Sequence, residues 1–209
     1  MKNFLSIDQG TTSSRSIIFD ANLNLVTDAQ EEYDLTYPED GWVELEPKKI
    51  VETVTNTLNK VVSADIGLEA CGITNQRETT IVWSKATGEA IYPGIVWQDR
   101  RTHEYCSYLK SNGHEPAIKE KTGLLLDPYF SATKIKWILD NVDGAREKAS
   151  KGELLFGTVD SYLIYMLSKE KNHFTDVTNA SRTLLFNIKS MEWDDELLEL
   201  FEIPKTMMP

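Results

Sequence analysis

Apolar residues near the N-terminus come in short runs that polar residues separate. Residues 4–8 and 15–20 form two such runs, and the seven residues 8–14 are too few for a crossover helix. A connection this short joins antiparallel strands, so the pattern predicts a hairpin with a wide polar turn. A third run, at residues 25–33, follows another polar turn and predicts a third strand.

The spacing of apolar residues changes after residue 46. Glu46-Pro47 is typical of a helix start, because proline fits the first helical position. Apolar residues then recur at helical spacing, at Ile50, Val54, Leu58, Val61 and Val62. Residues 68–74 follow as a predicted buried strand. Three meandering strands, a crossover helix and a further strand favour a mixed sheet over a doubly wound parallel one.

The remainder of the chain is predicted to be mainly helical. A second hairpin is expected from 79–83 and 90–92, and a short strand at 153–156. Further helices are expected at 99–111, 131–142, 158–168 and 194–201. Acidic residues suited to cap helix starts are Asp99, Asp160 and Asp194. No internal repeat, low-complexity tract or linker interrupts the pattern.

Length and composition restrict the function classes. With 209 residues, of which 41% are hydrophobic, the chain can form one large domain. The net charge of −11 argues against a nucleic-acid partner, because phosphate backbones bind clustered lysine and arginine. The sequence shows no signal peptide and no apolar stretch of membrane-spanning length, so we expect a cytoplasmic protein that does not insert into membranes.

The stretch SIDQGTTSSR, residues 6–15, carries the first candidate chemistry. Gly10 permits a close approach of the backbone to a ligand, and successive N–H groups can form an anion-binding concavity. Hydroxyl donors follow at Thr11, Thr12, Ser13 and Ser14. Arg15 adds a permanent charge, and Asp8 can hold Mg²⁺ through water. The alternative is an ordinary polar turn, which favours the same residue types.

Three further stretches contain residues suited to a small polyol. In ITNQRETTIVW, residues 73–83, Arg77 offers donors and Glu78 an acceptor, as hydroxyl groups require. The alternative is a surface ion pair, which the pattern alone favours. Trp97, in GIVWQDRRT, can pack on ligand carbons or in a core. Tyr129, in GLLLDPYFSATK, can extend its hydroxyl to a ligand or simply pack its ring.

Several stretches together resemble the FGGY carbohydrate-kinase family, of the actin/hexokinase/Hsp70-like phosphotransferase superfamily. They occur in the expected order along the chain: LSIDQGTTSSRSIIFD, NQRETTIVW, IVWQDRRT, TGLLLDPYFSATKIKWIL, ELLFGTVDSYL, TDVTNASRTLLFNI and WDDELLELFEIP. NQRETT and DPYFS are similar to the members that phosphorylate glycerol. The resemblance implies a ribonuclease H-like fold, a mixed sheet flanked by helices and incomplete at the C-terminal end.

The resemblance also implies roles for the candidate residues. It assigns the phosphates of ATP to Thr11, Thr12, Ser13 and Arg15, and it places Asp8 near Mg²⁺. It assigns hydrogen bonds with glycerol to Arg77, Glu78 and Tyr129, and contact with the glycerol carbons to Trp97. Tyr162 stands where family members often carry tryptophan, which we interpret as a packing difference.

Parts of the family pattern are not found in this sequence. The resemblance implies that the catalytic aspartate, the adenine-binding residues and the FGGY segment lie further along a longer chain. We therefore expect residues 1–209 to be most of an N-terminal domain, without the C-terminal domain and inactive alone. The full-length protein is expected to be a homo-oligomer. Two alternatives stay open: a kinase for another polyol or sugar, and a non-catalytic actin/Hsp70-like nucleotide-binding module.

Overall fold

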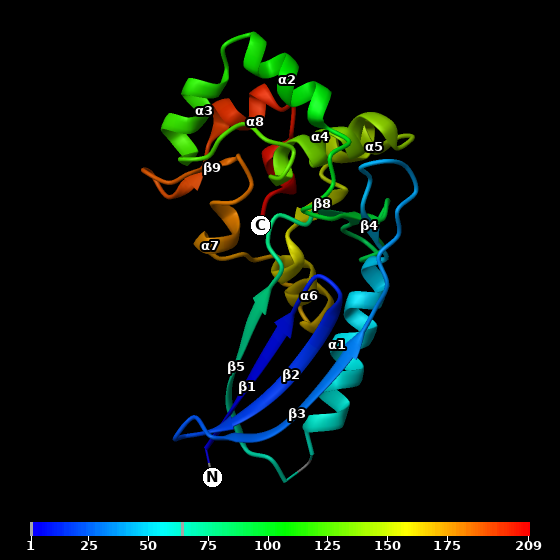
Figure 1. Cartoon of the computed structure of the whole chain (residues 1–209), viewed down its shortest axis with the longest axis vertical. Coiled ribbons are helices and arrows are strands. Elements are labelled where there is room, and N and C mark those ends of the chain that lie inside the picture. Colours follow the sequence, from blue (N-terminus) through cyan, green and yellow to red (C-terminus); the bar gives the residue numbers. More distant parts are fainter. Residues whose placement is uncertain (1, 64) are drawn as a thin grey trace. The chain divides into compact units, whose positions relative to one another are not determined.

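The computed structural model describes residues 2–63 and 65–209, which divide into two compact units (Figure 1). Unit 1 comprises Met1–Leu35 and Glu46–Gln76. Unit 2 comprises Thr36–Leu45 and Arg77–Pro209. The predicted phosphate-binding residues belong to unit 1, and the predicted polyol-binding residues belong to unit 2.

Unit 1 is a four-stranded mixed sheet with one helix, as predicted (Figure 1). The strand order is β3-β2-β1-β5, where β1 is Asn3–Gln9, β2 is Ser13–Asp20, β3 is Leu25–Glu32 and β5 is Leu68–Asn75. β1 pairs antiparallel with β2 and parallel with β5. Helix α1, Pro47–Val61, makes the crossover that this parallel pairing requires.

Helix α1 is fixed to one face of the sheet by apolar and hydroxyl contacts. Ile50 is fully buried in this layer. The hydroxyl oxygens of Ser14 and Thr53 lie 2.9 Å apart, and those of Ser16 and Thr57 lie 2.8 Å apart. Since side chains alternate along a strand, Ser13 and Arg15 point to the opposite face of the sheet.

The turn between β1 and β2 is tighter than predicted, because both strands extend further. Only residues 10–12 lie between them, and the Gly10 N–H donates to the Ser13 carbonyl at 2.8 Å. Gln9 and Ser14 are polar but fully buried, and their side chains have hydrogen-bond partners there. Polar residues therefore continue the strands where the sequence indicated a wide loop.

The prediction that β5 is buried was wrong. Most of its residues are exposed, Cys71 among them. β5 is an edge strand that pairs with β1 alone among the described residues, so one side of it is open. The apolar pattern of a strand predicts burial in both cases, whether its outer edge is covered or open.

Unit 2 is largely helical and encloses one hydrophobic core. Its helices are α2 His103–Ser111, α3 Glu115–Thr122, α4 Ser131–Asn141, α5 Ala145–Ser150, α6 Val159–Leu167, α7 Val177–Ala180, α8 Asp195–Leu200 and the 3₁₀ helix η1 Lys205–Met207. Short two-stranded sheets pair β4 Glu44–Leu45 with β7 Gly94–Ile95, β6 Ile81–Ser84 with β8 Leu154–Gly157, and β9 Phe186–Asn187 with β10 Glu192–Trp193. Ile118, Ile135 and Phe201 are fully buried in the core.

Two of the three predicted helix caps were wrong. Helix α2 begins at His103 after Thr102, and the buried Asp99 carboxylate accepts the Val43 N–H at 2.6 Å instead of capping a helix. Thr158 precedes helix α6, while Asp160 accepts hydrogen bonds from threonine hydroxyls. Asp194 does cap α8, since its carboxylate accepts the Leu197 N–H at 3.1 Å.

Gly157 ends β8 where no side chain fits. A Cβ at this position would lie 2.5 Å from the Ser161 Cβ and 2.8 Å from the fully buried Trp83 ring. Tyr162 makes an edge-to-face contact with the same indole, with 5.2 Å between the ring centroids, in line with the packing role expected for it. A methyl group at residue 157 must therefore displace a close-packed ring.

We expect Gly157→Ala to destabilise this chain by about 2–3 kcal/mol, because overpacked cores relax only through side-chain and backbone shifts. Urea unfolding followed by tryptophan fluorescence measures the loss. Gly72→Ala is the matched control, since no heavy atom lies within 4 Å of its Cβ position. Equal unfolding midpoints for the two variants would contradict the packing argument.

Candidate functional site

The five predicted phosphate-site residues gather at the β1–β2 turn of unit 1. Asp8 and Arg15 are opposite each other in the β1–β2 register. Both side chains therefore lie on the face of the sheet that α1 does not cover. Thr11 and Thr12 form the turn, and Ser13 begins β2. The structure thus brings together hydroxyls, a carboxylate and a guanidinium at one end of the hairpin.

Arg15 is held by β3, which the sequence analysis did not foresee. Its Nε and Nη2 atoms donate to Oδ2 of Asp28 at 3.0 and 2.6 Å. Gln30 of the same strand donates to the Ser13 hydroxyl at 3.0 Å. Exposed ion pairs are weak, so a phosphate can compete with Asp28 for this guanidinium. The only sequence signal for these partners is the alternation along β3.

A buried amide and phenol network lies beneath the turn. Three donors converge on the Gly10 carbonyl: Gln9 Nε2 at 2.7 Å, Tyr33 Oη at 2.7 Å and Gln76 Nε2 at 3.1 Å. Burial raises the pKa of Tyr33 to about 12, so its hydroxyl stays protonated and donates. This network fixes the backbone of the turn from below, as preorganised anion binding requires.

The carboxylate of Asp8 fits a hydrated metal ion and not an all-protein cage. Asp8 is exposed at the end of β1. Within residues 2–63 and 65–209, no three His, Cys, Asp or Glu residues stand close enough to hold a metal directly. Mg²⁺ commonly keeps several waters and binds one or two carboxylates together with substrate phosphates. A single carboxylate beside phosphate donors is consistent with that mode.

Glu78 is the centre of the candidate site in unit 2. Its backbone is left-handed, with a φ of +62°, and the residue is only 3% exposed. Its carbonyl accepts the Ser131 hydroxyl at 3.1 Å, and its Oε1 accepts Arg182 Nε at 2.5 Å. A non-glycine residue held in this conformation costs about 1–3 kcal/mol, and such strain concentrates at functional sites.

Arg77 and Glu78 do not form the ion pair that the sequence left as an alternative. Glu78 pairs with Arg182, which is 104 positions further along the chain. The Arg77 side chain is exposed and has no partner among the residues that the structure describes. Arg77 therefore stays available to a ligand next to a carboxylate that is already oriented.

Two predicted aromatic residues lie against each other at this site. The rings of Trp97 and Tyr129 make an edge-to-face contact with 5.6 Å between centroids, and both are half-buried. The backbone N–H of Trp97 donates to the Thr79 hydroxyl at 3.3 Å, and the backbone N–H of Tyr129 donates to the Asp127 carboxylate at 2.9 Å. Trp97, Tyr129 and Glu78 thus come from three separate segments of unit 2.

Arg182 connects Glu78 with Tyr129, and its residue type and local spacing had indicated no role for it. Its guanidinium carbon lies 5.7 Å from the Tyr129 ring centre and 5.0 Å from that of Phe130. The same side chain holds Glu78 through its Nε. No local spacing pattern could reveal a pair so distant in sequence.

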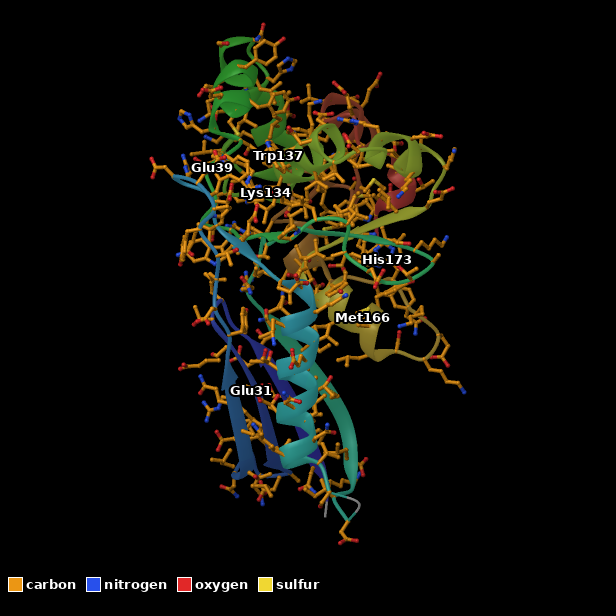
Figure 2. The ribbon with its side chains drawn as sticks, turned by 90° about the vertical axis from the view of Figure 1, so that its right-hand side faces the viewer. Glu31, Glu39, Lys134, Trp137, Met166 and His173 are labelled. Atoms are coloured by element: carbon orange, nitrogen blue, oxygen red, sulfur yellow. The ribbon has the colours of Figure 1, made fainter. Side chains whose placement is uncertain are left out.

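Lys134, labelled in Figure 2, lies on helix α4. Its side chain holds the turn that carries Tyr129. The residue is fully buried, and its Nζ donates to the carbonyls of Pro128 at 2.8 Å and Tyr129 at 2.6 Å. Burial lowers the pKa of Lys134 to about 7, against the opposing charges of Asp99 and Glu78. Lys134 is a second residue that the sequence analysis missed.

A buried arginine, surrounded by two carboxylates and an aromatic ring, holds the segment that follows Trp97. The Arg101 side chain is fully buried, and its Nη2 lies 2.8 Å from both Asp99 and Glu44. Its guanidinium carbon lies 3.8 Å from the ring centre of Trp42. Asp99 is therefore structural, as predicted, although it secures a loop and does not cap a helix.

The fold and the two groups of residues define the class of protein. The mixed sheet with flanking helices and the similar solved structures give the chain the ribonuclease H-like fold of the actin/hexokinase/Hsp70-like phosphotransferases, in agreement with the predicted fold class. The family model described as the FGGY family of carbohydrate kinases, N-terminal domain, matches residues 3–209. The chain therefore belongs to the FGGY carbohydrate-kinase family, which confirms the resemblance.

Known proteins are similar over the whole chain. A glycerol kinase of Oceanobacillus iheyensis is 58% identical over 212 residues, and one of Haemophilus influenzae strain Rd is 55% identical. The crystal structure of Plasmodium falciparum glycerol kinase with ADP superposes with a TM-score of 0.95 at 34% identity, covering 100% of this chain and 42% of that one. A ligand-bound xylulose kinase from Lactobacillus acidophilus gives a TM-score of 0.89 at 25% identity, covering 100% of this chain and 41% of that one.

The chain matches only part of these relatives. It is covered completely, yet it spans 42% of the length of both the Oceanobacillus and the Haemophilus enzyme.

Among the described residues, no helix has the length and apolar character needed to cross a membrane.

Proposed function

We propose that this chain is part of a kinase that transfers the γ-phosphoryl group of ATP to a terminal hydroxyl of glycerol, giving sn-glycerol 3-phosphate. The observation that carries the proposal is the environment of Glu78, a buried residue with a left-handed backbone whose carboxylate has one oxygen held by Arg182. Its other oxygen has no protein partner among the described residues, so it can accept a hydrogen bond from a hydroxyl. The 58% identity with a glycerol kinase favours glycerol as that ligand.

The candidate residues take the following roles in this proposal. The nucleotide phosphates bind Thr11, Thr12, Ser13 and Arg15. Glycerol binds Arg77, Glu78 and Tyr129 through its hydroxyls and Trp97 through its carbons. Asp8 holds Mg²⁺ through water, and the ion would neutralise charge on the phosphates. The ADP in the Plasmodium structure supports a nucleotide substrate for a fold of this kind.

Other parts of the reaction are proposed to lie outside the matched region. Residues 1–209 would form most of the N-terminal domain, with the general base and a C-terminal domain in the remaining length of the relatives. The chain alone would then give no turnover. As a full-length protein it would be a cytoplasmic homo-oligomer whose two domains close on the substrates and exclude water.

A chimera tests the proposal. This chain replaces the matching part of the Oceanobacillus iheyensis glycerol kinase, with which it shares 58% identity. We expect glycerol-dependent formation of ADP by the chimera and none by this chain alone, as followed by a coupled ADP assay. A chimera that phosphorylates xylulose or gluconate well and glycerol poorly would favour another substrate of the family. Folded protein that binds nucleotide but no polyol would favour a non-catalytic module.

A further inference from the structure

We infer that Arg182 is a positioning residue of the polyol site, which orients both Glu78 and Tyr129 toward the acceptor substrate. This inference rests on the proposed function for the identity of that substrate. The residues with proposed ligand contacts lie in the first hairpin and within residues 77–129, and none belongs to the segment around residue 182.

The first argument is electrostatic. The Glu78 side chain is 4% exposed, and a carboxylate in such a place requires a compensating charge. Arg182 supplies that charge through a short hydrogen bond from Nε to Oε1. Charge-assisted hydrogen bonds of this kind are about twice as strong as neutral ones and fix the orientation of the carboxylate plane. The second oxygen, Oε2, is thereby held in one direction as an acceptor.

The second argument is the contact of Arg182 with the aromatic residues. Its guanidinium lies within cation–π distance of both Tyr129 and Phe130. Phe130 precedes helix α4, and Tyr129 is the predicted hydroxyl donor to glycerol. One side chain therefore contacts the carboxylate and the aromatic ring that are proposed to meet the same small ligand.

The third argument is the anchoring of the segment that carries Arg182. The Thr183 carbonyl accepts the Ala132 N–H at 2.9 Å, and the Ser131 hydroxyl donates to the Glu78 carbonyl at 3.1 Å. The first turn of α4 thus joins the segments around residues 78 and 182. The Arg182 side chain is 32% exposed, so it can be replaced without leaving a large cavity in the core.

The variants Arg182→Ala and Arg182→Lys in the chimera test the inference. We expect Arg182→Ala to raise the KM for glycerol about 10- to 100-fold, the range that loss of a hydrogen bond to a charged group implies. The KM for ATP should change less than twofold, and added guanidinium should restore part of the glycerol affinity. Arg182→Lys keeps a charge but not the planar geometry, and it should give an intermediate KM. Arg146→Ala is the control. Arg146 pairs with Asp140, and among the described residues it has no recorded contact with Glu78, Trp97 or Tyr129.

A double-mutant cycle with Glu78→Gln separates positioning from a general structural role. We expect Arg182→Ala to add little to the effect of Glu78→Gln, because both changes disrupt the same pair. Additive effects without guanidinium rescue, or a lower kcat with an unchanged KM for glycerol, would overturn the inference. If the unmodified chimera phosphorylates a different polyol or sugar, the proposed function fails, and the same KM comparison with that substrate still decides the role of Arg182.

Discussion

Glu78→Gln is expected to lower kcat/KM for glycerol in the chimera about 100- to 1,000-fold. Hydrogen bonds to charged groups contribute about 1.5–3 kcal/mol each, and this change removes the charge from two of them, one to Arg182 and one to the proposed hydroxyl. Glutamine also has a single acceptor oxygen. If that oxygen faces Arg182, an N–H group faces the substrate hydroxyl and the acceptor position is lost.

The measurement is steady-state ADP formation with glycerol and ATP varied separately. Glu147→Gln provides the matched control, because Glu147 is an exposed carboxylate paired with Lys151 on helix α5. Its kcat/KM should equal that of the unmodified chimera. The KM for ATP should stay within about twofold in both variants, because the predicted ATP-binding residues belong to the other unit. A Glu78→Gln variant that retains more than a tenth of the glycerol kcat/KM would refute the central role of this carboxylate.

Local patterns were sufficient to predict the early elements of the fold. The antiparallel β1–β2 pairing followed from the shortness of its connection, and the start of α1 followed from Glu46-Pro47. The prediction that β5 is buried failed because its outer edge is open. The cap prediction for Asp99 failed because a side chain can bind a partner far away in sequence. Asp99 reads as a helix cap, yet its carboxylate binds the N–H of Val43, 56 positions earlier.

The same limit applies to the candidate site. Glu78, Trp97 and Tyr129 were identified from residue type and resemblance. In the structure Arg182 contacts Glu78 and Tyr129, and Trp97 packs against Tyr129. Arg182 lies in the stretch TDVTNASRTLLFNI, whose resemblance to the family assigned it no role. Lysine is a residue type usually found exposed, yet Lys134 lies on the buried face of α4, and only the tertiary fold shows that its Nζ donates to the Tyr129 carbonyl. Whether a polar residue supports a site depends on long-range packing, which spacing alone does not report.

Lys134→Met is expected to destabilise this chain by about 2–4 kcal/mol at pH 7. Methionine retains most of the aliphatic volume but leaves the carbonyls of Pro128 and Tyr129 without their lysine donor. Each buried acceptor without a partner costs about 1–3 kcal/mol. Relief from burying a charged amine offsets part of this loss, which keeps the expected value below the full sum. Urea unfolding measures the difference, with the exposed Lys151→Met as control.

The difference between the two proteins should also depend on pH. Burial lowers the pKa of folded Lys134 to about 7, whereas the unfolded chain keeps the ordinary value of 10.5. Between these values the unfolded state binds more protons, so the contribution of Lys134 to stability rises with pH. The difference in the free energy of unfolding between wild type and Lys134→Met should therefore increase from pH 7 to pH 9. The neutral amine still donates to the carbonyls, without the cost of a buried charge. A gap that stays constant or narrows would mean that the carbonyls hold the ammonium form in the folded chain, and the buried charge itself would then stabilise the Tyr129 turn.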